Sequence, residues 1–221
     1  GKSFFAKMFG RLFGRHFLQV ANSQHLVGNF NAHLRDSVVV FGDEAFYAGD
    51  KKHESILKTL VTEENIVIEG KGVDAEPSRN YVHLILASND EWVVPAGLDE
   101  RRFFVIEMSD GHKQDHAYFK TIRRDLEAGG FENLLHFLRT YDLSDFEVRK
   151  VPQTKTLREQ QTFSLPPVQA YFLDCLRGGN PPEGAEPHAS GSGYFVTSDA
   201  LVEDMRHKGR QIGRASCRER G

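Results

Sequence analysis

The sequence is poor in cysteine and has no long hydrophobic run. Its two cysteines, Cys175 and Cys217, lie far apart and belong to no CxxC or Cys/His pair. This pattern argues against a disulfide framework and against a structural zinc site. No apolar run approaches the roughly 18 residues that a membrane span needs, and no signal peptide can be recognised. These absences predict a soluble, cytoplasmic protein without membrane contact.

An excess of charge of one sign is also missing. The chain has 28 lysines and arginines against 31 aspartates and glutamates, for a net charge of −3. There is therefore no bulk attraction to nucleic acid, and any DNA contact has to come from a local basic cluster. What the sequence does contain is phenylalanine, with 17 in 221 residues, and an apolar fraction of 39%. This supply predicts one sizeable core with a smaller second unit.

The first three residues, Gly1-Lys2-Ser3, match the end of a nucleotide-binding P-loop. Apolar residues at helical spacing follow as far as Phe13, which predicts the helix that succeeds such a loop. Gly1, Lys2 and Ser3 are therefore candidate ATP-binding residues, with Lys2 on the β and γ phosphates and the Ser3 hydroxyl on Mg²⁺. A solvated terminal lysine is the alternative for Lys2. Because the Gly-rich first half of the motif does not precede Gly1, we expect a fragment of a longer protein.

Two acids follow the apolar run Val38 to Phe41. Such a run is typical of a strand buried on both faces of a parallel sheet, and ligands usually bind at the carboxyl edge of such a sheet. Asp43 is expected to hold Mg²⁺, and Glu44 to act as general base toward the attacking water. Solvated loop acids are the alternative. The combination with Gly1-Lys2-Ser3 makes an ATPase the leading interpretation.

Polar groups also follow a second predicted strand, Val82 to Ala87. The Asn89 amide is a candidate for orienting the water or contacting the γ-phosphate, although Asn-Asp pairs also form plain turns. Arg101 and Arg102 precede a third predicted strand at residues 103–106. An arginine supplied to a neighbouring subunit's ATP stabilises transition-state charge, whereas a surface ion-pair cluster is the alternative. Spacing does not choose between the two arginines.

The remaining segments predict a hairpin and several helices. Residues 65–82 predict a hairpin or a loop excursion with Gly70-Lys71-Gly72 at its tip. Residues 17–20 predict a short strand and residues 22–34 a loop with a short helix. Helices are expected at residues 55–61, 114–127, 132–140, 168–176 and 197–207.

A composition shift predicts three parts: a core over residues 1–150, a linker and small C-terminal helical module over 151–210, and a tail over 211–221. We expect a polar linker at 151–165 and a flexible connection at 178–193. The helical module is interpreted as the opening of a winged-helix domain. The tail resembles the translation of a sequencing-adapter oligonucleotide, and an ordinary basic tail is the alternative.

The order of the motifs resembles the superfamily 3 helicase core within the AAA+ ATPases, and most closely the helicase part of phage and plasmid primase-helicases. The resemblance rests on the Gly1-Lys2-Ser3 and Asp43-Glu44 motifs, the Lys-bearing hairpin, LILASND at 84–90 and DERRFFV at 99–105, and it covers about residues 1–165. Residues 28–34 and 91–97 also look like stretches of that family.

This resemblance implies an α/β P-loop fold, with a parallel sheet flanked by helices and lacking its first, central strand. It also implies a hexameric ring that hydrolyses ATP with Mg²⁺ and moves along single-stranded DNA during replication of a phage or plasmid. In that family the hairpin grips the DNA backbone, so Lys71, and secondarily Arg79, are candidate DNA-binding residues. A solvated turn is the alternative for Lys71. No primase motif is visible.

Other functions remain as alternatives. A non-catalytic assembly or DNA-binding module would keep the ring contacts without hydrolysis, but it would tend to lose Asp43, Glu44 and Asn89. A nucleotide kinase would need an acceptor-binding lid, which we do not find. His112 and His116 have a spacing that can bind zinc, but a solvated helix face explains them better. Trp92 can stack on a base, although a lone tryptophan more often belongs to a core or a subunit contact.

Overall fold

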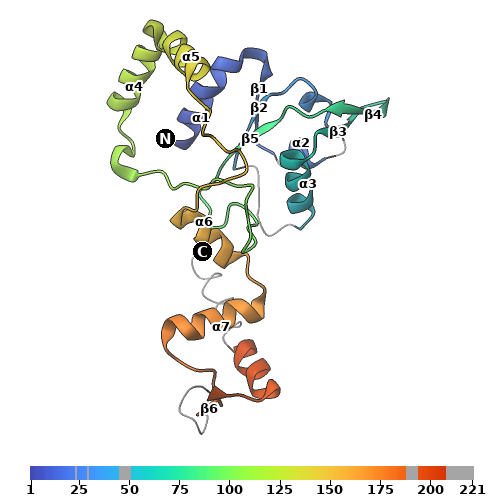
Figure 1. Ribbon diagram of the computed structural model, residues 1–221, viewed down its shortest axis with the longest axis vertical. Coiled ribbons are helices and arrows are strands. Elements are labelled where there is room, and N and C mark those ends of the chain that lie inside the picture. Colours follow the sequence, from blue (N-terminus) through green and yellow to red (C-terminus); the bar gives the residue numbers. More distant parts are fainter. Residues whose placement is uncertain (23, 29, 45–50, 188–193, 208–221) are drawn as a thin grey trace. The chain divides into compact units, whose positions relative to one another are not determined.

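The computed structural model describes residues 1–22, 24–28, 30–44, 51–187 and 194–207 (Figure 1). The chain divides into two compact units, Gly1–Gln161 and Thr162–Gly221. The division falls later in the chain than the expected boundary at residue 150. The adapter-like tail and residues 188–193 of the expected flexible connection lie outside the described residues.

The first unit is built on a sheet of three parallel strands. The strands are β1 (Phe17–Val20), β2 (Val39–Asp43) and β5 (His83–Ala87), in the order β1-β2-β5. β2 pairs with both neighbours and is buried over four of its five residues. The predicted strands at 17–20, 38–41 and 82–87 and the parallel α/β sheet are therefore confirmed.

Helix α1 (Lys2–Gly10) packs on one face of this sheet and continues into the short helix η1 (Arg11–His16). Ala6 is fully buried and forms a small cluster with Phe41 of β2 and Ala87 of β5. Gly10 allows the close approach of helix and sheet, since a Cβ atom there would lie 2.3 Å from Cδ2 of Phe17. The contacts of Ala6 and Gly10 hold α1 against the sheet, and this packing places the first residues of α1 near the ends of β2 and β5.

The opposite face of the sheet carries the larger core. Successive residues of a strand point to opposite faces, and Val40, next to Phe41, packs into this second cluster. The cluster also takes in residues from α2 (Gln24–Val27), η2 (Ala32–Leu34) and α3 (Lys51–Thr62). The fully or nearly fully buried members from these elements are Leu26, Leu34, Leu57 and Leu60. The short helix expected within residues 22–34 and the helix expected at 55–61 are present.

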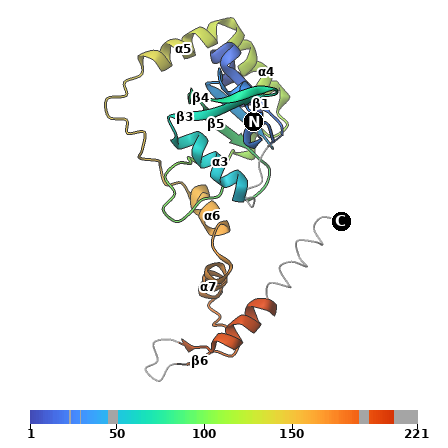
Figure 2. The same ribbon diagram turned by 90° about the vertical axis from the view of Figure 1, so that its right-hand side faces the viewer.

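A two-stranded antiparallel hairpin stands beside the sheet (Figures 1 and 2). It comprises β3 (Asn65–Gly70) and β4 (Val73–Arg79), and Lys71 and Gly72 form the turn between them. Gly72 has a φ of +73°, a conformation that glycine adopts at little cost. Ile66 and Ile68 are buried in the larger core, whereas Val67 between them is exposed. The predicted hairpin and its tip are confirmed.

The prediction of a strand at residues 103–106 is wrong, because these residues form no β-ladder with another strand. The alternation that suggested it is present, since Phe103 is buried and Val105 packs on the core while Phe104 and Ile106 are exposed. However, a strand also needs a hydrogen-bonded neighbour. In the part of the chain that the structure describes, the sheet ends at β5.

Helical structure follows in η3 (Asp110–His112), α4 (His116–Asp125), η4 (Leu126–Gly130) and α5 (Phe131–Thr140). The helices expected at 114–127 and 132–140 are thus present. Aromatic contacts join them to the N-terminal helices: the rings of Phe4 and Phe119 lie 5.0 Å apart, and the Arg11 guanidinium lies 4.3 Å from the Phe131 ring.

The expected polar linker at 151–165 contains a helix instead, α6 (Lys155–Phe163). Leu157 is fully buried, and the buried Gln160 accepts a hydrogen bond from Val93 N at 2.7 Å and donates one to Glu91 O at 2.7 Å. Leu157 and Gln160 thus anchor a helix within a segment whose composition is mostly polar.

The second unit contains α7 (Pro167–Gly178), the short strands β6 (Glu186–Pro187) and β7 (Tyr194–Phe195), and a helix over residues 198–207. The two helices expected here are present. The buried Tyr171 hydroxyl donates to Asp204, which also accepts from Glu183 N at 2.9 Å. Burial raises the pKa of Tyr171 above its usual value, and the bond to Asp204 adds to this. This polar network joins the two helices.

Candidate nucleotide site

Five predicted site residues meet at the carboxyl edge of the parallel sheet. Asp43 ends β2 and is paired in register with Ala87, the last residue of β5. Parallel strands end at the same edge, so the residues after β2 and β5 lie side by side. The first residues of α1 reach the same edge because Ala6 packs in one cluster with Phe41 and Ala87. We call the group Lys2, Ser3, Asp43, Glu44 and Asn89 the edge cluster.

The Lys2 ammonium group turns toward the residues that follow β5. Its Nζ atom donates to the backbone carbonyl of Ser88 and to Oδ1 of Asn89, the latter at 2.7 Å. Both partners are neutral acceptors, so the positive charge of Lys2 is not cancelled by an ion pair within the described residues. An uncancelled cation at a helix start suits a phosphate group.

Ser3 and Asp43 form a pair of oxygen ligands. The Ser3 hydroxyl donates to Oδ1 of Asp43 at 3.0 Å, and Gln19 Nε2 lies 3.5 Å from Oδ2 of the same carboxylate. Both Ser3 and Asp43 are half-buried. Hydroxyl and carboxylate oxygens are hard ligands, and Mg²⁺ usually takes one or two of them from a protein. The residues present therefore fit the predicted ion.

Glu44 has an unusual backbone conformation and a fully engaged carboxylate. Its φ is +53°, a left-handed value that costs free energy in residues with a side chain. Ser88 Oγ lies 3.0 Å from Oε2, and the backbone N–H of Asn89 donates to Oε1 at 3.0 Å. Glu44 N donates in turn to Ala87 O at 2.8 Å. These bonds couple the expected general base to the expected sensor.

The two candidate arginines differ in their surroundings. The backbone N–H groups of both donate to Oε1 of the buried Glu100, at 2.9 Å for Arg101 and 2.7 Å for Arg102. The Arg102 guanidinium also pairs with Glu100 at 3.5 Å, and its buried Nε has no partner in the described structure. The Arg101 side chain is exposed, and no ion pair is found for it among the described residues. Among the described residues, neither guanidinium contacts the edge cluster.

The DNA-binding candidates lie on the hairpin, apart from the edge cluster. Lys71 is exposed at the turn. Arg79, at the other end of β4, is exposed and lies with its guanidinium 5.7 Å from the ring of Tyr81. The two cations therefore sit at opposite ends of β4.

The weaker candidates have local contacts. The Trp92 indole N–H donates to Val94 O at 3.1 Å, which ties this ring into its own loop. His112 stacks on Tyr118 with ring centroids 3.7 Å apart and lies 3.1 Å from the Asp115 carboxylate. The backbone N–H of Tyr118, and then His112, hold the pKa of Asp115 below its usual value.

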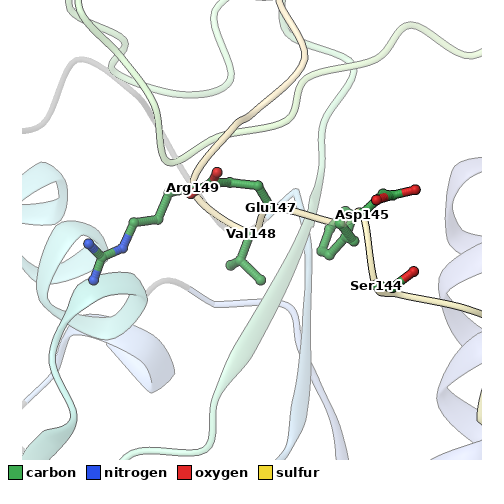
Figure 3. Close-up of a pocket in the computed structure, with 6 residues that line it drawn as sticks. Ser144, Asp145, Glu147, Val148 and Arg149 are labelled. Carbon is green, nitrogen blue, oxygen red and sulfur yellow. The ribbon is translucent and has the colours of Figure 1, made fainter.

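The described residues contain no group of three or more His, Cys, Asp or Glu side chains suited to a metal. A hollow in the surface is lined by residues 144–149, and Figure 3 shows Arg149 and Asp145 pointing to opposite sides. It shares no residue with the edge cluster, and its side chains do not converge. Within the described segments, no helix has the length and apolar character that crossing a membrane requires.

Two contacts of the edge cluster were not predicted. Ser88 binds Glu44, and Gln19 approaches Asp43. Ser88 could have been found, because it immediately precedes Asn89 at the end of a predicted strand. Gln19 gave a weaker signal, as the one polar residue of the run Phe17 to Val20.

The fold and site together define a parallel α/β protein with a polar cluster at the carboxyl edge of its sheet. Residues 1–102 match a family described as a family of unknown function, DUF5906. No curated protein matches the sequence.

Solved structures of the C-terminal region of NrS-1 have a similar fold. An apo structure of NrS-1 residues 305–718 matches with a TM-score of 0.65 at 20% identity, over 76% of this chain and 41% of that one. An A form apo structure of this region matches with a TM-score of 0.65 at 20% identity, over 81% and 46%. Another matches with a TM-score of 0.63 at 17% identity, over 94% and 55%. This chain thus spans about half of the NrS-1 region.

Proposed function

We propose that the chain is part of an ATP-driven motor that moves along single-stranded DNA during replication of a phage or plasmid. The observation that carries the proposal is the meeting of Lys2, Ser3, Asp43, Glu44 and Asn89 at one sheet edge. These residues come from separate parts of the sequence. They comprise a cation, hydroxyl and carboxylate oxygens and a sensor amide, which are the groups that ATP hydrolysis uses.

Each member of the edge cluster has a distinct task in this proposal. Lys2 neutralises phosphate charge, while Ser3 and Asp43 hold Mg²⁺, which would offset the negative charge of the phosphates when bound. Glu44 accepts the proton of the attacking water. Asn89 reports the state of the site, because its amide oxygen binds Lys2 and its backbone N–H binds Glu44.

Arg101 is the better candidate for acting on the ATP of a neighbouring subunit in a hexameric ring. Arg102 is the weaker candidate, because its guanidinium forms an ion pair with the buried Glu100 of its own chain. An arginine that acts between subunits has to be exposed and unpaired until the neighbour arrives, and Arg101 meets this condition among the described residues. A guanidinium placed in this way stabilises transition-state charge.

The hairpin supplies the DNA contact in this proposal. Lys71 at its tip, with Arg79 second, would bind backbone phosphates with little sequence preference. The likeness to NrS-1 supports the fold, while the DNA role rests on the exposed lysine and on the resemblance to superfamily 3 helicases.

The decisive experiment measures ATP hydrolysis with and without single-stranded DNA in a full-length protein that contains this chain. Glu44→Gln keeps the size of the side chain but removes the base, so hydrolysis should fall by about 10²- to 10⁴-fold. Glu132→Gln, an exposed change of the same kind on α5, is the matched control and should hydrolyse ATP like the wild type. Hydrolysis that ignores both DNA and Glu44 would overturn the motor and favour a non-catalytic DNA-binding or assembly module.

A further inference from the structure

One short segment outside the β3–β4 hairpin, residues 31–35, contacts both of its strands. The Asn31 amide donates through Nδ2 to Val67 O at 2.8 Å and accepts through Oδ1 from Glu69 N at 2.8 Å. The backbone N–H of Asn31 also donates to Glu69 O at 3.1 Å. Asn31 therefore makes three hydrogen bonds to the outer edge of β3, in the manner of a neighbouring strand.

The same segment also contacts the other strand of the hairpin. Arg35, just after η2, pairs with Glu76 of β4, and both side chains are about half exposed. An exposed ion pair of this kind contributes little. Asn31 is therefore the main contact, with Arg35 as a weaker second one.

The hairpin needs such support because a two-stranded ribbon is only marginally stable in water. β3 is rooted in the core by Ile66 and Ile68, but nearly all of β4 is exposed. The buried side chains fix the face that β3 presents to the core. The bonds from Asn31 add a second attachment, at the outer edge of β3.

We infer that Asn31 is a positioning residue that sets the direction of the hairpin and so the place of Lys71. The inference rests on the proposed function, since it concerns the DNA contact of the same motor. Asn31 touches neither the tip nor the edge cluster in the described contacts. It acts through β3, four residues before Lys71 at Val67 and two before it at Glu69.

A double-mutant cycle tests this inference in the full-length protein. The affinity for a fluorescent oligo-dT strand is measured for the wild type, Asn31→Ala, Lys71→Ala and the double variant. Lys71→Ala should weaken binding and lower the salt slope by about 1. Asn31→Ala should weaken binding about threefold or more, and this loss should vanish in the Lys71→Ala background, because residues that act through one contact are not additive.

Asn65→Ala is the matched control. Asn65 lies on β3 itself, is exposed, and its amide has no hydrogen bond within the described residues, so its change should leave DNA affinity as in the wild type. An Asn31→Ala loss that persists in full with Lys71→Ala would reduce Asn31 to a structural residue and overturn the inference. If Lys71→Ala itself has no effect, the proposed DNA contact fails instead.

Discussion

The edge cluster and the β3–β4 hairpin are held in place by different kinds of contact. In the edge cluster, backbone geometry places the side chains, because β2 and β5 end in register and α1 packs on both through Ala6. In the hairpin, the side-chain amide of Asn31, which lies outside the ribbon, binds the backbone of β3. Damage to the first region should therefore spread through the core, whereas damage to the second should stay local.

The largest effect is expected from Phe41→Ala. Phe41 is fully buried in one cluster with Ala6 and Ala87, two residues before Asp43 of the edge cluster. Its truncation should lower the free energy of unfolding of the first unit by about 3–5 kcal/mol. Chemical denaturation followed by the fluorescence of Trp92, the one tryptophan of the chain, measures this.

Val67→Ala is the counterpart on the hairpin. Val67 is 61% exposed. Val67→Ala should therefore change the free energy of unfolding, measured by the same denaturation, by no more than about 0.5 kcal/mol. If Phe41→Ala and Val67→Ala lower the free energy of unfolding equally, the proposed difference between the edge cluster and the hairpin is wrong.

The next effect concerns charge at the edge cluster. Lys2→Ala removes a cation that binds Asn89. ATP hydrolysis by the full-length protein should fall by about 10²- to 10³-fold, as for other groups that stabilise developing charge. Lys7→Ala removes the same charge from an exposed position of the same helix. Comparable losses in the two variants would show that the overall charge of α1 matters and the contact with Asn89 does not.

A smaller and more local effect than those of Phe41→Ala and Lys2→Ala is expected at the base of the hairpin. The Asn80 amide donates to Leu60 O and Glu63 O at the end of α3 and accepts from Val82 N. Asn80→Ala leaves these groups without their partner and should cost about 1–3 kcal/mol. Amide hydrogen exchange should then quicken in β3 and β4 before β2, while Asn65→Ala should exchange like the wild type. Uniform exchange across the first unit would contradict a local role.

Much of the edge cluster could be predicted because its chemistry follows the ends of buried strands. Val38 to Phe41 and Val82 to Ala87 are apolar enough to mark their strands, and parallel pairing then places Asp43 near Asn89. The hairpin could be predicted for a similar local reason, since Gly70-Lys71-Gly72 separates two strand-like runs.

What could not be predicted depends on single side chains that act over long distances in the sequence. Nothing in the pattern of residues 28–34 indicates that Asn31 binds β3, and nothing in residues 151–165 indicates that Gln160 anchors a helix. For residues 103–106 the sequence instead predicted a strand that the structure does not contain. Their apolar alternation is real, but a sequence pattern does not supply the neighbouring strand that a ladder requires.

Among the described residues β5 lies at the end of the sheet, and this position also affects how the protein can be handled. An edge strand offers unpaired backbone groups to any extended segment that meets it. The nearby residues 103–106 add exposed apolar side chains, Phe104 and Ile106. A preparation of this chain alone should therefore be prone to strand-to-strand association as its concentration rises, and a covering strand or a charged substitution at Phe104 should counter it.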